Sequence, residues 1–411
     1  MEPLISPASL TTLAIVLGAG MAAPMLCAGL ARFVRIPVVV MEMLLGIVIG
    51  PGLLGLVTQT SFVAVMATIG MWFLFYGAGY ETDFGILRGR VLATASGAWV
   101  ACLVLAVLAG VFIATLTAPV ATTPLVSGIF IGAALVSTGL GTILPMMRDA
   151  GQIDTTIGRA VISSGIIGQF TPLVALAILV GVFSPPIAVL THIAFFAVVA
   201  GVTYLAKHGL PAFAARVQSA TLDAGAQFGV RLQMFVCVVA VLLAHVLGVN
   251  LAIGAFGAGV VVRALLGQTN PEERSVIDRK VRGIIGGVFL PVFFINAGIS
   301  FDLPGLLAQP AAFTLIPVFL VLMLVVRGIP GSATLGLFRD GDRRSAVPWR
   351  ERASTSLLVG TGLAAVILMA DLGLEAGAIT SVMAAALMGA AKLSALIFPT
   401  VALNLARQAS A

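Results

Sequence analysis

Long apolar blocks recur along the chain, and only short polar stretches separate them. Most blocks are about 20 residues long, the length that an α-helix needs to cross the hydrocarbon core of a bilayer. Backbone groups inside lipid must be satisfied within helices or a closed barrel, and the short alternating segments of a barrel are not visible here. The pattern predicts an all-α polytopic membrane protein with about 13 transmembrane helices, at 9–31, 38–57, 61–79, 92–117, 125–147, 157–182, 186–206, 226–247, 251–266, 284–299, 311–336, 354–370 and 377–405.

Composition agrees with this pattern. Only 9% of the 411 residues are charged, whereas a soluble domain carries about 25%. With the N-terminus outside, almost every Lys and Arg falls in a cytoplasmic loop or at a cytoplasmic span end. We therefore expect a multi-pass protein of the cell (inner) membrane with its C-terminus in the cytoplasm. The net charge of +6 belongs to these loops, so a nucleic-acid partner is not expected.

Cysteine and histidine positions argue against an enzyme. The three cysteines lie in apolar blocks and the three histidines are scattered, without the spacing of a metal site or a nucleophile with its base. We expect no enzyme activity, no cofactor and no metal other than a transported cation.

Two short patterns recur at nearly the same offset. Phe75–Gly79 resembles Phe294–Gly298, which follows it by 219 residues, and Thr361 follows Thr138 by 223. The partners lie seven spans apart, so the second copy would be inverted, as in many secondary transporters. Coincidence in a Gly-rich and Ala-rich chain is the alternative. The predicted organisation is a first repeat with spans 1–6 (1–183), a linker with span 7 (184–222) and a second repeat with spans 8–13 (223–411).

The polar residues of this repeat lie in the fifth and twelfth spans. Thr138 and Thr361 each stand in the middle of a span beside a glycine, with Ser137 and Thr142 near the first and Thr355 near the second. Glycine lets the backbone leave helical geometry, and the freed carbonyls can coordinate a cation. We predict unwound segments near 137–142 and 358–362 that cross in the membrane. Small residues that allow close helix packing are the alternative.

Three more polar groups lie inside predicted spans: Gln169, Arg327 and Lys392. A charge at membrane depth costs about 2.5–3.5 kcal/mol even on lenient scales, so the two cations are candidates for function. The alternative for both is snorkelling to the interface. Every acidic residue lies in a loop or near a span end, Glu42 included, so Arg327 has no evident carboxylate partner.

Several short motifs occur in an order that covers essentially the whole chain. They are Leu44–Pro51 (G-x-x-x-G-P), Phe75–Asp83 (F-x-x-G-x-E, with Glu81 on the glutamate), Ser137-Thr138, Gly254–Gly259 (G-A-F-x-A-G), Pro291–Phe294 (P-x-F-F) and Arg327. In this order the chain resembles the monovalent cation:proton antiporter-2 family, the Kef-type and Nap-type sodium or potassium/proton exchangers.

The resemblance implies the sodium/proton antiporter fold, with a panel domain and a core domain of two crossed broken helices. It also implies a homodimer, elevator-type alternation and one membrane acid that binds a cation or a proton in competition. Counted from Gly158-Arg159, the place of this acid falls on Gln169, which cannot release a proton. Either Gln169 replaces a glutamate and locks the protein, or it is natural and the chain does something else.

The leading hypothesis is a Na⁺ or K⁺/H⁺ antiporter in a lipid bilayer, inactivated or altered as written by Gln169. The alternative is an anion or organic-acid carrier that uses Arg327 and Lys392; a membrane sensor without transport is less favoured. The ion-binding candidates are Gln169, Ser137, Thr138, Thr361 and Arg327, with Lys392, Thr142 and Thr355 as further candidates.

Overall fold

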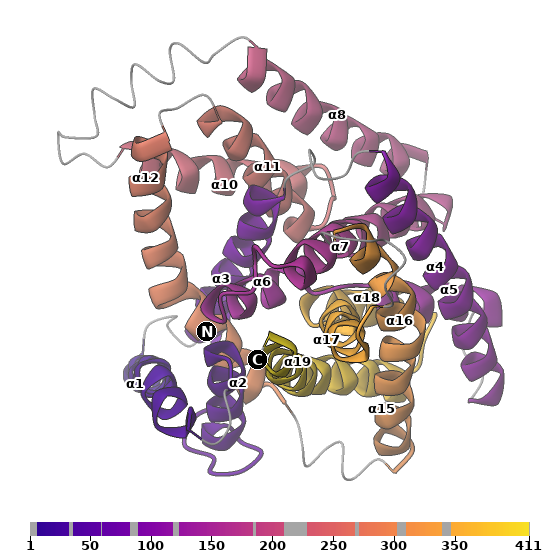
Figure 1. Cartoon of the computed structure of the whole chain (residues 1–411), viewed down its shortest axis with the longest axis horizontal. Coiled ribbons are helices and arrows are strands. Elements are labelled where there is room, and N and C mark those ends of the chain that lie inside the picture. Colours follow the sequence, from indigo (N-terminus) through magenta and orange to yellow (C-terminus); the bar gives the residue numbers. More distant parts are fainter. Residues whose placement is uncertain are drawn as a thin grey trace. The chain divides into compact units, whose positions relative to one another are not determined.

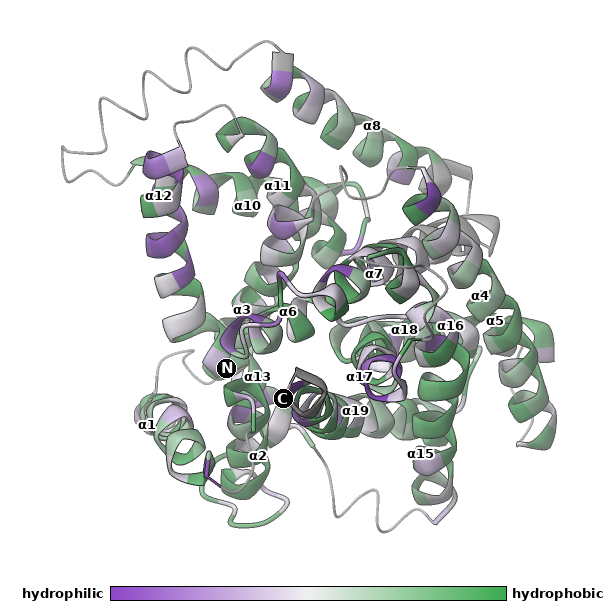
Figure 2. Cartoon of the chain, in the orientation of Figure 1, coloured by the Kyte–Doolittle hydropathy of each residue, from purple (hydrophilic) through white to green (hydrophobic). Residues whose placement is uncertain are grey.

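The computed structural model describes residues 6–32, 36–58, 60–82, 89–117, 123–183, 186–208, 228–267, 271–301, 310–338 and 347–410. Across these ranges all regular structure is helical (Figure 1). Within them nine helices are long and apolar enough to cross a membrane, ten if one pair bent by 42° counts as a single span. Hydrophobic residues line most of these helices in Figure 2. The all-α polytopic class is confirmed, whereas the count of thirteen spans stays a prediction.

The chain divides into two compact units, and each takes segments from both halves of the sequence. The first unit contains residues 1–13, 60–82 and 177–293, and the second contains 14–59, 83–176 and 294–411. Three helices have residues in both units: α1 (Pro7–Leu30), α7 (Thr156–Phe183) and α13 (Leu290–Ile299). The predicted inverted repeats are a different division of the chain, and their boundaries stay a prediction.

Close helix contacts made by glycine organise the first unit. In α3 and α11, a methyl group on Gly79 would overlap the backbone of Phe256, and one on Gly259 would overlap the carbonyl of Tyr76. The glycines of the G-A-F-x-A-G motif therefore allow two backbones to touch. The helices wholly within this unit are α3 (Ser61–Glu81), α8 (Pro186–His208), α10 (Phe228–Val246), α11 (Leu251–Leu266), α12 (Pro271–Ile284) and the π-helical turn η1 (Ile285–Phe289).

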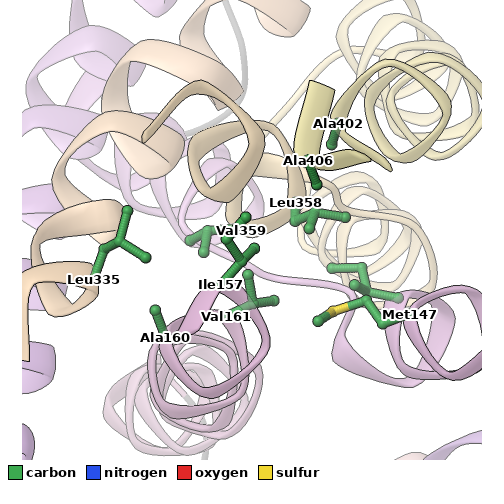
Figure 3. Close-up of a cluster of buried hydrophobic side chains, with 10 residues drawn as sticks. Met147, Ile157, Ala160, Val161, Leu335, Leu358, Val359, Ala402 and Ala406 are labelled. Atoms are coloured by element: carbon green, nitrogen blue, oxygen red, sulfur yellow. The ribbon is translucent and has the colours of Figure 1, made fainter. Parts of the chain in front are cut away.

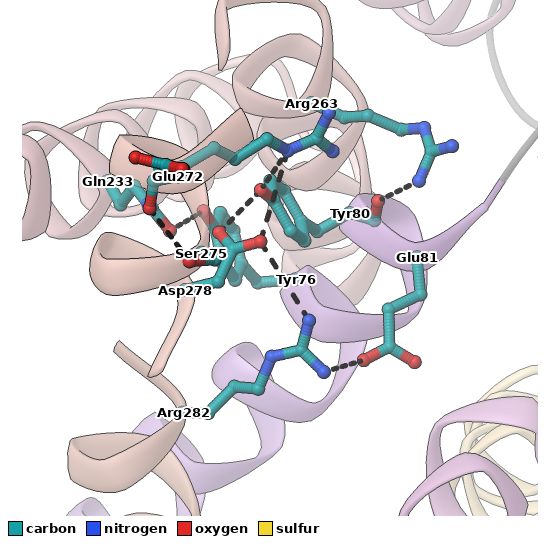
Figure 4. A network of polar contacts seen from close by, with 10 residues as sticks. Tyr76, Tyr80, Glu81, Gln233, Arg263, Glu272, Ser275, Asp278 and Arg282 are labelled. Carbon is teal, nitrogen blue, oxygen red and sulfur yellow. Dashed lines mark hydrogen bonds and ion pairs between the residues drawn. The ribbon is translucent and has the colours of Figure 1, made fainter. Parts of the chain in front are cut away.

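Polar side chains join α3, α10 and α12 within the same unit (Figure 4). The hydroxyl of Tyr76 donates to Gln233 Oε1 at 2.7 Å, and the hydroxyl of Tyr80 donates to Asp278 Oδ1 at 2.6 Å. Arg282 of α12 forms an ion pair with Glu81 at 3.7 Å. Glu81, the motif glutamate, thus lies at the end of α3 in a partly exposed pair, a setting where ion pairs contribute about 1 kcal/mol or less.

The second unit contains the broken helices. Its helices are α2 (Val38–Ile49), α4 (Arg90–Leu116), α5 (Pro124–Leu135), α6 (Leu140–Asp149), α15 (Pro310–Leu322), the π-helical η2 (Met323–Gly328), α16 (Ile329–Gly331), the 3₁₀ turn η3 (Ser332–Leu337), α17 (Trp349–Gly360), α18 (Ala364–Glu375) and α19 (Ser381–Ser410). Pro124 begins α5, where its missing N–H costs nothing. Pro330 has no N–H, so the carbonyl of Val326, four residues earlier, lacks its usual helical partner. Val326 lies in the π-helical η2.

An apolar cluster packs α6, α7, α17 and α19 together in this unit (Figure 3). Leu358 and Val359 lie in the last turn of α17, and they belong to the same cluster as Ile143 and Met147 of α6. The cluster therefore packs the helix that follows the first break, α6, with the helix that precedes the second, α17. The buried members are Ile143, Met147, Ile157, Ala160, Val161, Leu335, Leu358, Val359, Ala402 and Ala406.

Candidate functional site

Two interrupted helices meet in the second unit. Residues 136–139 separate α5 from α6, and residues 361–363 separate α17 from α18. The N–H of Gly139 donates to the carbonyl of Thr361 at 2.8 Å, so one break is hydrogen-bonded directly to the other. The predicted crossing of two broken helices is confirmed. The non-helical segments are shorter than predicted, because Leu140–Thr142 and Leu358–Gly360 remain helical.

Space at the crossing is limited, which explains the glycines beside the two threonines. A methyl group on Gly139 would lie 3.3 Å from the nitrogen of Leu363. One on Gly362 would lie 2.6 Å from Cγ2 of Val366. The backbone at the crossing therefore has little room for a side chain on either glycine.

Thr138 connects three elements at the first break. Its hydroxyl donates to the carbonyl of Val359 at 2.9 Å and accepts from Nε of Arg327 at 2.8 Å. Its N–H donates to the carbonyl of Gly168 at 3.0 Å. That carbonyl is free because Pro172, four residues later in α7, has no N–H to give it. A proline in one helix thereby provides an anchor for the unwound segment of another.

Arg327 is almost completely buried, with 1% of its surface exposed. Besides Thr138, its guanidinium donates to the carbonyl of Ser164 at 2.6 Å and approaches the sulfur of Cys102 at 3.9 Å. Among the residues that the structure describes, no carboxylate forms an ion pair with it. Within the described residues, the hydrogen bonds of the guanidinium go to Thr138, Ser164 and Cys102, and none goes to Gln169 or Thr361. A buried cation held by neutral groups alone is an energetically costly arrangement.

Gln169 belongs to α7, and its side chain lies beside the first turn of α6. Its side chain is 3% exposed, and its Oε1 accepts a hydrogen bond from the N–H of Gly141 at 3.2 Å. Gly141 is the second residue of α6, so this N–H has no partner within the helix. Helix N-termini favour negative charge, and a carboxylate at position 169 would suit this position better than the neutral amide.

Thr142 and Ser137 differ in how their hydroxyls are satisfied. The Thr142 hydroxyl is buried and has no hydrogen-bond partner among the described residues. The Ser137 hydroxyl donates to the carbonyl of Ala133 at 2.7 Å, one turn back in α5. Thr142 follows the residue that binds Gln169, so its free oxygen is available to a ligand at this end of α6.

Two of the sequence-predicted residues bind elsewhere. Thr355 donates to the carbonyl of Glu351 within α17, at 2.8 Å. Lys392 donates to the carbonyl and the hydroxyl of Ser300 at 2.9 and 3.2 Å, and its ammonium lies 5.5 Å from the ring centre of Phe301. Both residues lie in the same unit as the crossing, but these contacts direct their polar groups to other partners.

Three residues at the crossing were missed by the sequence reasoning. Ser164 and Cys102 contact Arg327, and the Ser394 hydroxyl donates to the carbonyl of Gly362 at 2.8 Å and accepts from its N–H at 3.2 Å. A signal existed for two of them, since Ser164 and Ser394 are polar residues in spans that also contain Gln169 and Lys392. Cys102 in its apolar helix carried no such signal.

Comparison with known proteins gives a consistent result. The family model described as "Sodium/hydrogen exchanger, transmembrane" matches residues 21–403. The chain is 23% identical over 349 residues to the Na(+)/H(+)-K(+) antiporter GerN of Bacillus cereus, with 82% of this chain and 84% of GerN covered. It is 26% identical over 412 residues to the putative Na(+)/H(+) antiporter YjbQ of Bacillus subtilis (strain 168), covering 95% of this chain but 62% of the length of YjbQ.

A solved structure has the same fold. The sodium proton antiporter MjNhaP1 from Methanocaldococcus jannaschii at pH 8 superposes with a TM-score of 0.59 at 17% identity, covering 98% of this chain and 97% of that one. The family model spans both broken helices, Gln169 and Arg327. The chain belongs to the sodium/hydrogen exchanger family of membrane proteins.

Proposed function

We propose that this chain is a secondary active transporter of the monovalent cation/proton antiporter type, for Na⁺ or K⁺, and that position 169 is its exchange position. The observation that carries the proposal is the crossing itself, where Gly139 binds Thr361 beside Gln169 and Arg327. The relatives GerN and YjbQ are named as antiporters of Na⁺ and H⁺, with K⁺ added for GerN. These names support the substrate class.

Position 169 has surroundings that suit a carboxylate. The unpaired N–H of Gly141 points at the side-chain oxygen, and the helix N-terminus behind it attracts negative charge. Arg327 lies against Gly168, the residue before position 169. No carboxylate among the described residues forms an ion pair with its guanidinium. A glutamate at 169 would compensate the guanidinium, and it could hold either a cation or a proton but not both.

Glutamine removes the titration on which this competition depends. Mutual exclusion of the two ligands couples their fluxes, because each one changes the affinity for the other. We therefore expect no proton-coupled cation exchange from the chain as written. We expect Gln169→Glu to create or restore exchange.

The test uses proteoliposomes that contain the full chain. An internal pH dye reports proton efflux when Na⁺ or K⁺ is added outside, for the chain as written, for Gln169→Glu and for Gln233→Glu. Gln233 is equally buried, at 2% exposed, but lies in the first unit on Tyr76, so it controls for merely adding a buried carboxyl. Exchange in Gln169→Glu alone supports the proposal. Robust exchange by the unaltered chain would place the coupling residue elsewhere.

Alternating access would then be of the elevator type, in a homodimer in the cell membrane with the N-terminus outside. The division into two compact units supports movement of one unit as a body, and every residue assigned to the crossing lies in the second unit. Mass photometry of the purified protein would test the dimer. Labelling of single cysteines placed in the external and cytoplasmic loops of intact cells would test the orientation.

A second candidate is an anion or organic-acid carrier. The observation that favours it is the buried Arg327 without a carboxylate partner among the described residues. Lys392 contributes less than the sequence suggested, because it is bound to Ser300. Uptake of labelled chloride or a dicarboxylate by the unaltered chain, lost in Arg327→Met, would favour this function over cation exchange.

A further inference from the structure

One carboxyl group is buried away from the crossing. Glu42 of α2 is 5% exposed, and it is the only Asp or Glu in the described part of the chain that is this deeply buried. Its side chain makes no hydrogen bond and no ion pair there. The sequence placed Glu42 near the end of a span, and the fifth position of α2 agrees with that, but the sequence did not predict its burial.

The helices packed around Glu42 bring few cationic groups that could balance a negative charge on its carboxyl. Four residues along the same face of α2, Gly46 lies against the backbone of Ile295 in α13, so the two helices touch. The second-unit helix α6 also packs on α2, and so does α19. Cys27 of α1 packs against Met41, the residue before Glu42.

The charged and titratable groups on these elements are few. Asp149, at the end of α6, acts on Glu42 with a like charge, and Arg148 beside it partly offsets Asp149. The thiol of Cys27 is the third group near enough to interact. The helix α13 contains no titratable residue, and α19 offers Lys392, which binds Ser300, and Arg407 in its last turn.

An isolated ionised carboxylate in such a place is very costly, so the charge must be neutralised. A proton needs a single oxygen, whereas a bound metal cation needs several oxygen ligands. Among the described residues, the Glu42 carboxyl forms no hydrogen bond and no ion pair. A proton neutralises this carboxyl without any further ligand, so we infer protonation of Glu42 and not cation binding.

We propose that Glu42 is a second proton-binding site of this chain, separate from the Gln169 position, and that its proton is exchanged where α2 contacts α6. Loss of the proton would place two negative charges, on Glu42 and Asp149, at α6, the helix whose N-terminal end binds Gln169. Protonation of Glu42 would thus stabilise the packing of α6. The inference does not depend on exchange at position 169.

The test is covalent labelling of the full chain in liposomes. Dicyclohexylcarbodiimide modifies protonated carboxylic acids in apolar surroundings, and mass spectrometry locates the product. We expect labelling of Glu42 at acid pH that declines as the pH rises, and complete loss of this label in Glu42→Gln. Asp149→Asn is the control that should keep the label, because Asp149 is not the carboxyl that the reagent modifies.

A second readout covers a carboxyl that the reagent cannot reach. Infrared difference spectra over the same pH series should show a protonated-acid C=O band that is absent in Glu42→Gln. If Glu42→Gln removes neither a label nor a band at any pH, the proposal is wrong. Neither readout requires transport, so an inert Gln169→Glu variant would count against the proposed function and leave this inference standing.

Discussion

The Thr138 hydroxyl joins Thr138 to Arg327, and it both accepts and donates a hydrogen bond. It accepts from the guanidinium Nε at 2.8 Å and donates to the carbonyl of Val359, so a buried cation, an unwound segment and the other broken helix share one oxygen. No other described side chain joins the guanidinium to both broken helices. The position of Arg327 and the geometry of the crossing therefore depend on each other.

Thr138→Val should destabilise the chain far more than Thr142→Val. The first change leaves a buried guanidinium N–H and a buried carbonyl without partners, at about 1–3 kcal/mol each. The second removes a hydroxyl that has no partner among the described residues, in a side chain of the same size in the same region. Thermal unfolding followed by fluorescence-detected gel filtration measures the difference. Equal midpoints for the two variants would contradict the assigned role of Thr138.

Gly168→Ala should destabilise the protein by about 1–3 kcal/mol, the usual cost of overpacking. The added methyl group would overlap the guanidinium of Arg327 and lie 2.7 Å from the Thr138 hydroxyl. Gly97→Ala in α4 is the control, because nothing lies within 4 Å of its added methyl group. The same unfolding assay applies, and a Gly168→Ala variant as stable as Gly97→Ala would show that the crossing is loosely packed.

Arg327→Met should cost more stability in the Gln169→Glu background than in the chain as written. With Glu at 169, the change leaves a buried carboxylate without its counter-charge, at about 3–5 kcal/mol. With Gln at 169, Arg327→Met removes a cation that already lacks a counter-charge. A double-mutant cycle in unfolding free energy should give a coupling of about 0.5–3 kcal/mol between the two positions. Additive effects would mean that Arg327 is not the partner of that position.

Lys392→Met should lower stability without abolishing exchange in the Gln169→Glu background. Its ammonium donates to the carbonyl of Ser300, just past the end of α13, where a cation is favoured by the helix dipole. Hydrogen bonds to charged groups contribute about 1.5–3 kcal/mol. Ser300→Ala, which keeps the backbone carbonyl, should be milder. Dye-reported exchange lost in Lys392→Met at unchanged stability would move Lys392 into the transport site.

Sequence alone determined the features that depend on local composition. Apolar blocks of membrane length fix the all-α polytopic class, because lipid leaves a helix as the only way for such a block to satisfy its backbone. Threonine beside glycine in the fifth and twelfth spans indicated both breaks, because glycine removes the steric penalty for leaving the helix. That position 169 corresponds to the family's membrane acid is implied by the resemblance, counted from Gly158-Arg159, and stays a prediction.

Only the tertiary structure decided which polar groups meet. The partners of Arg327 lie 163, 189 and 225 residues away in the chain, and no local pattern predicts contacts at such separations. Helix packing brings Thr138, Ser164 and Cys102 to the guanidinium and directs Lys392 to Ser300 instead. Packing also buries Glu42, which the sequence showed only as an acid near a span end, because burial depends on what the neighbouring helices cover.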